Sequence, residues 1–265
     1  MRRCRYGRVD RRSVLTLLES GIVVLAGLVA GGMNAVVGSG TLVTFPVLLA
    51  LGYPPVVANV SNSLGLVPGS VTGAIGYRRE LAGQRGRLLR FGAVTVVGAI
   101  TGALLLLALP ADSFEAILPV LIVIALVLVV AQPWLARRLA ERKPDRHVHG
   151  GLPLLIGVFC TAIYGGYFGA SQGVVLVALM GIMMAESLQR LNAIKNVFVA
   201  IANLVSGLVF VVIADVDWQV VGLLAGGSIL GGMVGAKIGR RLSPTWLRAA
   251  IVVVGLVAVG QLIAS

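Results

Sequence analysis

The chain is a succession of long apolar stretches separated by short polar ones. Most of the stretches reach the roughly 20 residues that a helix needs to cross a bilayer. The apolar runs occupy residues 14–37, 41–51, 56–77, 88–109, 114–135, 152–169, 174–184, 188–213, 220–238 and 247–263. This pattern predicts an all-α, polytopic membrane protein.

Two of the runs are too short to cross a membrane. Runs 41–51 and 174–184 would each cover only about half of a 30 Å hydrocarbon core, and each follows a glycine-rich tract, 31–40 or 165–173. A backbone that leaves the helix in lipid needs protein or a water-lined cavity to satisfy its N–H and C=O groups. Paired broken helices are typical of transporters, and they indicate where the substrate binds.

The second half of the chain repeats the first. A shift of 133 positions superposes five pairs without a gap, namely Gly32 on Gly165, Gly40 on Gly173, Asn59 on Asn192, Gly98 on Gly231 and Gly102 on Gly235. Glycines that recur every fourth residue, as at 227, 231 and 235, predict faces where helices pack closely. The chain is therefore interpreted as a duplicated unit.

Loop charges indicate that the two units have opposite orientations. The basic segment 78–90 corresponds to the region of the acidic turn 215–217, and the acidic segment 110–112 corresponds to the region of the basic pair at 240–241. Because basic loops stay in the cytoplasm, this swap predicts inverted repeats. Six arginines before the first run oppose that topology, so either the first broken region crosses differently or the basic tail lies outside.

Composition confines the chain to the membrane. Hydrophobic residues make up 58% of its 265 residues, and the mean hydropathy is +0.98. The net charge of +12 comes from clusters between apolar runs, which favours cytoplasmic loops over nucleic-acid binding. The expected division is a basic tail (1–13), a first transmembrane repeat (14–140), a polar cytoplasmic linker (141–151) and a second transmembrane repeat (152–265).

Other chemistry finds little support. Cys4 and Cys160 imply no disulfide framework, and His147 and His149 lie in the polar linker, where a solvated loop is favoured over a metal site. The motifs of hydrolases, metalloproteases and P-loop proteins are missing from the sequence. We expect no enzyme activity, no cofactor and no metal.

Polar residues inside apolar runs cost free energy and so indicate function. They are few and lie near the breaks. The candidates for binding a solute, including the glycines that open the half-helices, are Asn34, Ser39, Gly40, Asn59, Asn62, Ser63, Tyr167, Ser171, Gln172, Gly173, Asn192, Lys195 and Asn196. The alternative for the asparagines is hydrogen bonding between helices.

Lys195 is the most informative of these residues, because a lysine at the centre of a membrane helix is costly. It either faces a shared cavity or extends to the cytoplasmic face beside Arg190. In a cavity, its charge, the asparagine amides and the free N–H groups after Gly40 and Gly173 would favour a small anion. No carboxylate lies deep in an apolar run, so no proton relay is predicted.

The stretch 30–52, AGGMNAVVGSGTLVTFPVLLALG, resembles the opening motif of the TauE/SafE family of sulfite exporters and related anion permeases. Segment 164–173 and the following LNAIKN at 191–196 resemble that family too. The resemblance implies an inner-membrane permease for sulfite, sulfonates or similar organosulfur anions. The first motif has Gly38-Ser39-Gly40-Thr41 where the family usually has a glycine cluster, a departure that alters the polarity of the pocket.

We therefore predict a multi-pass transporter of the inner membrane, built as two inverted repeats of about four to five helices each. Its expected partners are a small anionic solute, which it exports, and the lipid bilayer. Two alternatives are a non-transporting assembly factor or scaffold, and a cation permease. The cation permease is disfavoured because the only deep charge is positive.

Overall fold

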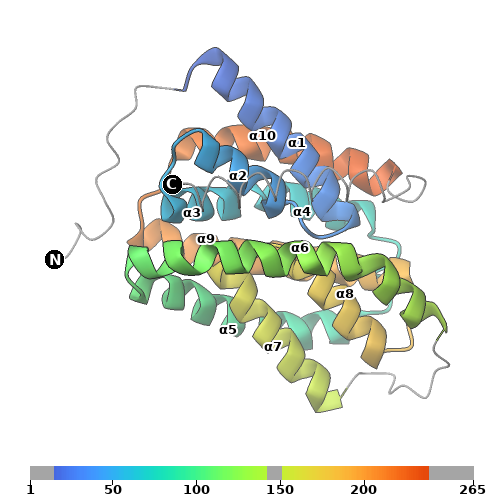
Figure 1. Cartoon of the computed structure of the whole chain (residues 1–265). Helices are drawn as coiled ribbons and strands as arrows, with labels where there is room; N and C mark the ends of the chain where they lie inside the picture. The colour runs from blue at the N-terminus through green and yellow to red at the C-terminus, as the bar shows by residue number, and fades with distance from the viewer. Residues whose placement is uncertain (1–14, 142–150, 239–265) are drawn as a thin grey trace.

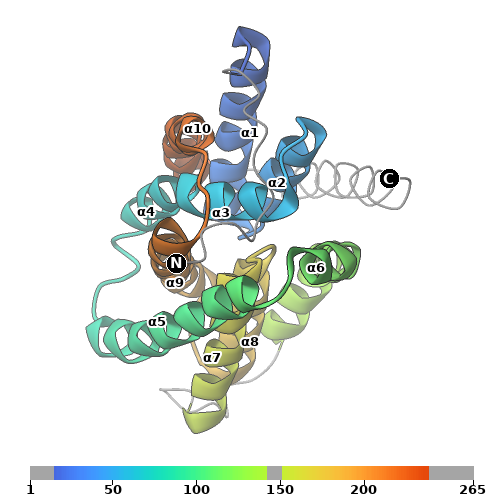
Figure 2. The ribbon, with the colours of Figure 1, turned by 90° about the vertical axis from the view of Figure 1, so that its left-hand side faces the viewer.

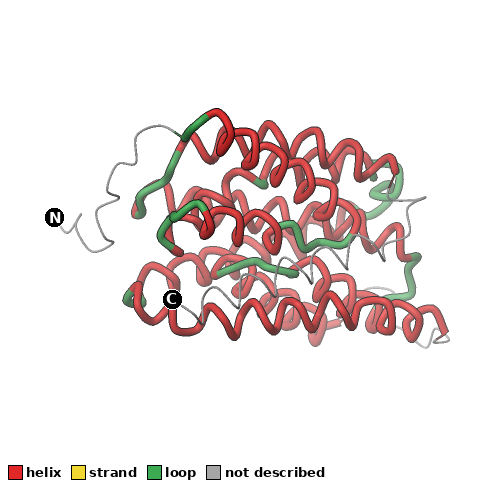
Figure 3. The backbone as a smooth tube through the Cα atoms, turned by 45° about the horizontal axis from the view of Figure 1, so that its top comes forward, coloured by secondary structure: helices red, strands yellow, loops and turns green. Residues whose placement is uncertain are grey.

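A computed structural model describes residues 15–141 and 151–238. These residues form helices joined by short loops, with no strand among them (Figure 3). The expected tail 1–13, most of the linker 141–151 and the last apolar run 247–263 lie outside the described residues. The helices are α1 (Leu17–Val36), α2 (Thr41–Ala50), α3 (Pro55–Gly65), α4 (Val67–Gly76), α5 (Arg85–Ala108), α6 (Ala111–Glu141), α7 (Gly151–Tyr167), α8 (Gln172–Met183), α9 (Leu188–Ile213) and α10 (Trp218–Ile238).

Five of the described helices, α1, α5, α6, α9 and α10, are long and apolar enough to cross a membrane. Helices α2, α7 and α8 are apolar but shorter. Large side chains such as Leu17, Val127 and Val212 are exposed, as they are in a protein whose surface faces lipid. The protein is an all-α, multi-pass membrane protein.

Both predicted breaks are confirmed. Helix α1 ends at Val36, and Gly38 then takes a left-handed backbone conformation with φ +88° before α2 begins. Helix α7 ends at Tyr167, and both Gly169 and Ser171 have positive φ before α8 begins. Glycine tolerates this conformation because it has no Cβ.

The apolar run 56–77 differs from the continuous helix that its length predicts. It forms two short helices, α3 and α4, which meet at Leu66. Pro68 lies in the first turn of α4, where its missing N–H costs nothing, whereas inside a longer helix its ring would clash with a preceding carbonyl. The corresponding α9 has no proline and is continuous.

Two pairs of helices, packed along their length, join the halves of the chain. Helix α1 packs along α10, and α5 packs along α7. Under the shift of 133 positions α1 corresponds to α7 and α10 to α5, so the two pairs are equivalent. Figure 2 shows α1 and α10 at the top of the bundle, α5 and α7 at the bottom, and α3, α4 and α9 between them.

Glycines make these two contacts possible. A Cβ added to Gly231 of α10 would lie 1.9 Å from the carbonyl oxygen of Leu28 on α1. A Cβ added to Gly102 of α5 would lie 2.0 Å from the carbonyl oxygen of Ile163 on α7. The backbones therefore touch, as the spacing of the glycines predicts.

The two halves also differ in direction. Figure 1 shows α1 and its counterpart α7 running in opposite directions across the bundle. Such a course is what inverted repeats require. The inverted topology across the membrane stays a prediction.

Candidate substrate site

The two helix breaks meet in the middle of the protein. The backbone N–H of Gly173 donates a hydrogen bond of 3.2 Å to the carbonyl oxygen of Gly38. A Cβ added to either glycine would lie 2.6 Å from the Cα of the other. Segments 135 positions apart in the chain are thus in backbone contact at the place where both helices are interrupted.

Lys195 of α9 lies beside this contact. Its side chain is fully buried, and its Nζ donates to the carbonyl oxygens of Asn34 at 2.7 Å and Ala35 at 3.3 Å. The alternative in which Lys195 extends to the cytoplasmic face is therefore wrong. The carbonyls belong to the last turn of α1, where the helix dipole is negative and favours a cation.

Asn192 and Asn196 extend the polar face of α9. Both donate to the carbonyl oxygen of Ala35, with Nδ2–O distances of 3.0 Å and 3.3 Å. They lie three positions before and one position after Lys195, so the three side chains converge on one end of α1. The broken end of α1 is thus covered by amides and one ammonium group.

A reciprocal hydrogen bond exists in the other half. Asn59 of α3 donates at 2.9 Å to the carbonyl oxygen of Tyr167, the last residue of α7. Asn59 and Asn192 correspond under the shift of 133 positions. Each half therefore provides an asparagine that satisfies the broken helix of the other half.

Asn34 organises the first break from within. Its Oδ1 accepts a hydrogen bond of 3.1 Å from the backbone N–H of Gly40, and its Nδ2 donates to Ser70 Oγ at 3.2 Å. The prediction of free N–H groups after Gly40 and Gly173 is wrong for Leu42, Val43, Val174 and Val175, which donate to the carbonyl oxygens of Ser39, Gly40 and Ser171. The N–H groups of Gly40 and Gly173 themselves donate to Asn34 Oδ1 and to the carbonyl oxygen of Gly38. Asn34 reaches the N–H of Gly40, just before α2, because only six positions separate the two residues in the chain.

Asn62 occupies the position that corresponds to Lys195 in the other half. Its Nδ2 donates to Thr41 Oγ1 at 3.3 Å, and its Oδ1 accepts from Thr44 Oγ1. Both hydroxyls belong to α2 of the same half. Asn62 thus fastens α3 to the half-helix α2, whereas Lys195 crosses to the opposite half.

Several predicted site residues have other contacts. Ser171 donates at 3.1 Å to the carbonyl oxygen of Ala125 on α6, away from Lys195, and Ser63 donates at 2.9 Å to Asn59 O on its own helix. Tyr167 packs its ring against Phe114, and its buried hydroxyl makes no hydrogen bond within the described residues. The contacts of Ser171 and Ser63 are explained by hydrogen bonds to backbone carbonyls.

Other predicted residues bury polar groups without a protein partner. The hydroxyl of Ser39 and both side-chain polar atoms of Gln172 are buried and make no hydrogen bond to the residues that the structure describes. Ser39 directly follows Gly38, and Gln172 directly precedes Gly173. Both therefore adjoin the contact between the two breaks. Such groups are rare in proteins and often mark a place where water, an ion or a ligand binds.

Sequence reasoning missed three contributors. The carbonyl of Ala35 accepts from three side chains, Ser70 accepts from Asn34, and Thr44 donates to Asn62. A backbone carbonyl carries no side-chain signal, and a lone hydroxyl in a helix usually bonds its own backbone. The only sequence signal for Ala35 was its place in the glycine-rich tract 31–40.

The match to known proteins decides the family. The family model described as sulfite exporter TauE/SafE matches residues 23–262. The chain belongs to this family. The TauE/SafE match covers both breaks, Lys195 and every other predicted site residue.

Curated relatives of this TauE/SafE protein are named as transporters. The chain is 27% identical to the probable membrane transporter protein YfcA of Escherichia coli (strain K12) over 244 residues, which cover 92% of this chain and 89% of the relative. It is 25% identical to a probable membrane transporter protein of Haemophilus influenzae, with 91% and 93% covered. No solved structure gives a significant match. The chain is therefore a membrane transporter of the TauE/SafE type.

Proposed function

We propose that this TauE/SafE protein is an inner-membrane permease that exports small anions, with sulfite and sulfonates as the leading candidates. The observation that carries the proposal is the fully buried ammonium group of Lys195, with which no carboxylate pairs within the described residues. A buried charge without a counter-ion is costly. A small anion would supply the missing negative charge.

The surroundings of Lys195 suit an oxyanion. Asn192 and Asn196 place amide donors on the same face of α9. Ser39 and Gln172 contribute buried polar groups that have no protein partner. Several donors around one cation can bind the oxygens of a sulfite or sulfonate group while the charge is neutralised.

Transport requires that the contact between the breaks opens. The two breaks are joined by the hydrogen bond between Gly173 and Gly38, and Lys195, Asn192 and Asn196 donate to the end of α1. These hydrogen bonds have to open when the breaks separate. The anion then replaces the carbonyls of Asn34 and Ala35 as the partner of Lys195, and access alternates as the α1–α10 side of the bundle moves against the α5–α7 side.

The direction of transport follows from charge. Within the described residues no Asp or Glu is fully buried, so the transmembrane helices offer no buried acid as a proton relay. A membrane potential of 100 mV, negative inside, favours the exit of each negative charge by about 2.3 kcal/mol. Export therefore needs no coupling ion.

The test is sulfite flux in proteoliposomes. Vesicles loaded with radiolabelled sulfite and holding an imposed membrane potential should release it through the wild type and through Lys237→Met, which removes an exposed lysine of α10. Lys195→Met should reduce the sulfite flux to that of loaded vesicles without protein. Unchanged flux through purified, monodisperse Lys195→Met would overturn the proposal.

Ser39→Ala keeps the proposal testable where Lys195→Met fails to fold. The Ser39 hydroxyl bonds nothing in the protein, so its loss should leave the thermal stability unchanged. We expect the KM for sulfite to rise about tenfold, the effect of removing one hydrogen bond to a charged ligand. The matched control is Thr101→Val, which removes an exposed hydroxyl from α5. An unchanged KM would exclude Ser39 from the site.

A purely structural role is the alternative for Lys195, because Lys195 also caps α1. Its bonds to Asn34 and Ala35 stabilise a helix end and need no solute. A structural role predicts that Lys195→Met lowers the melting temperature, that Ser39→Ala has no effect, and that the folded Lys195→Met protein still carries sulfite. Loss of sulfite flux in folded Lys195→Met excludes it.

A further inference from the structure

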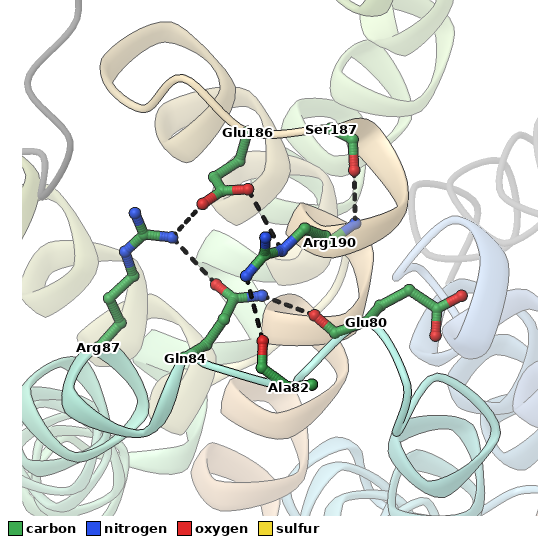
Figure 4. Close-up of polar contacts among 7 residues, drawn as sticks. All are labelled: Glu80, Ala82, Gln84, Arg87, Glu186, Ser187 and Arg190. Carbon is green, nitrogen blue, oxygen red and sulfur yellow. Dashed lines mark hydrogen bonds and ion pairs between the residues drawn. The ribbon is translucent and has the colours of Figure 1, made fainter.

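One end of the bundle holds a cluster of arginines around a single carboxylate. Glu186, in the loop between α8 and α9, forms ion pairs with Arg87 of α5 and Arg190 of α9 (Figure 4). The Arg190 Nε–Glu186 Oε2 distance is 3.3 Å. Since Arg87 and Glu186 belong to different halves of the chain, this ion pair joins the two halves.

Further hydrogen bonds link the cluster to the loop before α5. Arg190 donates to the carbonyl oxygen of Ala82 at 3.2 Å, and Arg87 donates to Gln84 Oε1 at 3.1 Å. Gln84 in turn donates to the carbonyl oxygen of Glu80 at 2.8 Å. The arginine side chains are therefore held in place, as Figure 4 shows.

These side chains border a cavity of about 470 Å³. The residues that line it include three arginines and one glutamate, so their formal charge is +2. Arg90 contributes to this excess, because it forms no ion pair within the described part of the chain. The full lining is Gly83, Gly86, Arg87, Arg90, Phe91, Glu186 and Arg190.

The cavity lies close to the candidate substrate site along α9. Arg190 precedes Lys195 by five residues, which is about 7.5 Å of helix. The cavity also lies at the basic segment 78–90, which the positive-inside rule assigns to the cytoplasm. Along the axis of α9, the lining residue Arg190 is therefore one to two helical turns from Lys195.

We propose that this cavity is a second anion site, at which Arg90 and Arg190 bind an oxyanion on the cytoplasmic side before it moves to Lys195. The site rests on the proposed anion transport. A sulfite or sulfonate offers the same oxygen acceptors as the Glu186 carboxylate. The bound anion thus competes with Glu186 for Arg190 and for Arg87, which also lines the cavity, and so loosens the link between α5 and the α8–α9 loop.

Calorimetric titration with sodium sulfite tests the site apart from transport. The probe is added to the full chain in nanodiscs of uncharged phosphatidylcholine at fixed ionic strength. Lys195→Met, which lacks the central cation, should still bind sulfite. Arg90→Gln in that background should weaken binding about tenfold, the effect of losing one charge-assisted hydrogen bond.

Arg85→Gln is the matched control, because Arg85 is an exposed arginine of the same helix that does not line the cavity. Equal affinities for Arg90→Gln and Arg85→Gln would overturn the second site. If sulfite binds to the Lys195→Met protein but the wild type does not transport it, the transport proposal fails and the second site stands.

Glu186→Gln tests the second site through a gain in sulfite affinity rather than a loss. The substitution removes the competing carboxylate and raises the formal charge of the lining from +2 to +3. We expect sulfite to bind several-fold more tightly to Glu186→Gln than to the wild type. Unchanged or weaker binding would contradict the proposed competition.

Discussion

Gly173 donates a hydrogen bond of 3.2 Å from its backbone N–H to the carbonyl oxygen of Gly38, so that the breaks of the two half-helices are in direct contact. The methylene groups of the Lys195 side chain pack against the same place, because a Cβ on Gly173 would lie 2.8 Å from Lys195 Cδ. Two glycines and one lysine thus form the centre of the protein. The proposed binding of a solute at Lys195 requires these residues to part.

Alanine at either glycine should destabilise the protein. A Cβ at Gly38 or Gly173 would lie 2.6 Å from the Cα of the other residue, and Gly38 also has φ +88°. Strained backbone at Gly38 costs about 1–3 kcal/mol, and the steric clash at Gly173 costs about as much, so the melting temperature in detergent should fall for Gly38→Ala and Gly173→Ala. Gly21→Ala, where nothing lies within 4 Å, is the control. A melting temperature equal to that of Gly21→Ala would show that the breaks do not touch.

The helix pairs α1–α10 and α5–α7 should be equally sensitive to added volume. Gly231→Ala and Gly102→Ala each place a methyl group about 2 Å from a carbonyl oxygen, where it has no room. We expect both to lower the melting temperature by several degrees, at a cost of about 1–3 kcal/mol. Gly222→Ala on α10 meets nothing within 4 Å and should be neutral. Equal stability of all three variants would argue against backbone contact between these helices.

Tyr53 should make the stability depend on alkaline pH. Burial, and then the charge and hydrogen bond of Asp217, raise the pKa of Tyr53 from 10.0 to about 12. In the unfolded chain the phenol loses its proton near pH 10, so stability should fall from pH 10 towards pH 12. Melting temperatures across this range should decline less steeply for Tyr53→Phe than for the wild type.

Asp217→Asn provides the comparison for Tyr53. It removes the negative charge, while its remaining oxygen can still accept from the N–H groups of Gln219 and Val220 at the start of α10. We expect a decline between those of the wild type and Tyr53→Phe. A slope for Tyr53→Phe that matches the wild type would exclude Tyr53 as the source of the effect.

The elements of the fold were predictable because their signals are local. Glycine tracts next to short apolar runs identified both breaks, since only a backbone that leaves the helix needs such residues there. The division of run 56–77 was missed, although Pro68 carried the signal. Whether a proline ends a helix depends on its position in the helix and on the residues around it. A hydropathy pattern does not contain that information.

The candidate site was predicted in part. Asn34, Asn192, Lys195 and Asn196 do converge at the end of α1. Ser171 turns to Ala125 instead, and the amides of Gly40 and Gly173 are already bonded. The direction of a side chain at a break depends on the backbone torsions and on which helix lies opposite, which a linear pattern does not contain.

By itself the sequence determined that the chain lies in a membrane and that each half contains an interrupted helix, because hydropathy and glycine spacing act through the nearest residues. Only the tertiary structure decided that Lys195 bonds the end of α1 rather than reaching the cytoplasmic face. It likewise decided that Glu186 joins Arg87, 99 positions away. Contacts between distant segments depend on how helices pack against one another, and that packing is a property of the whole fold.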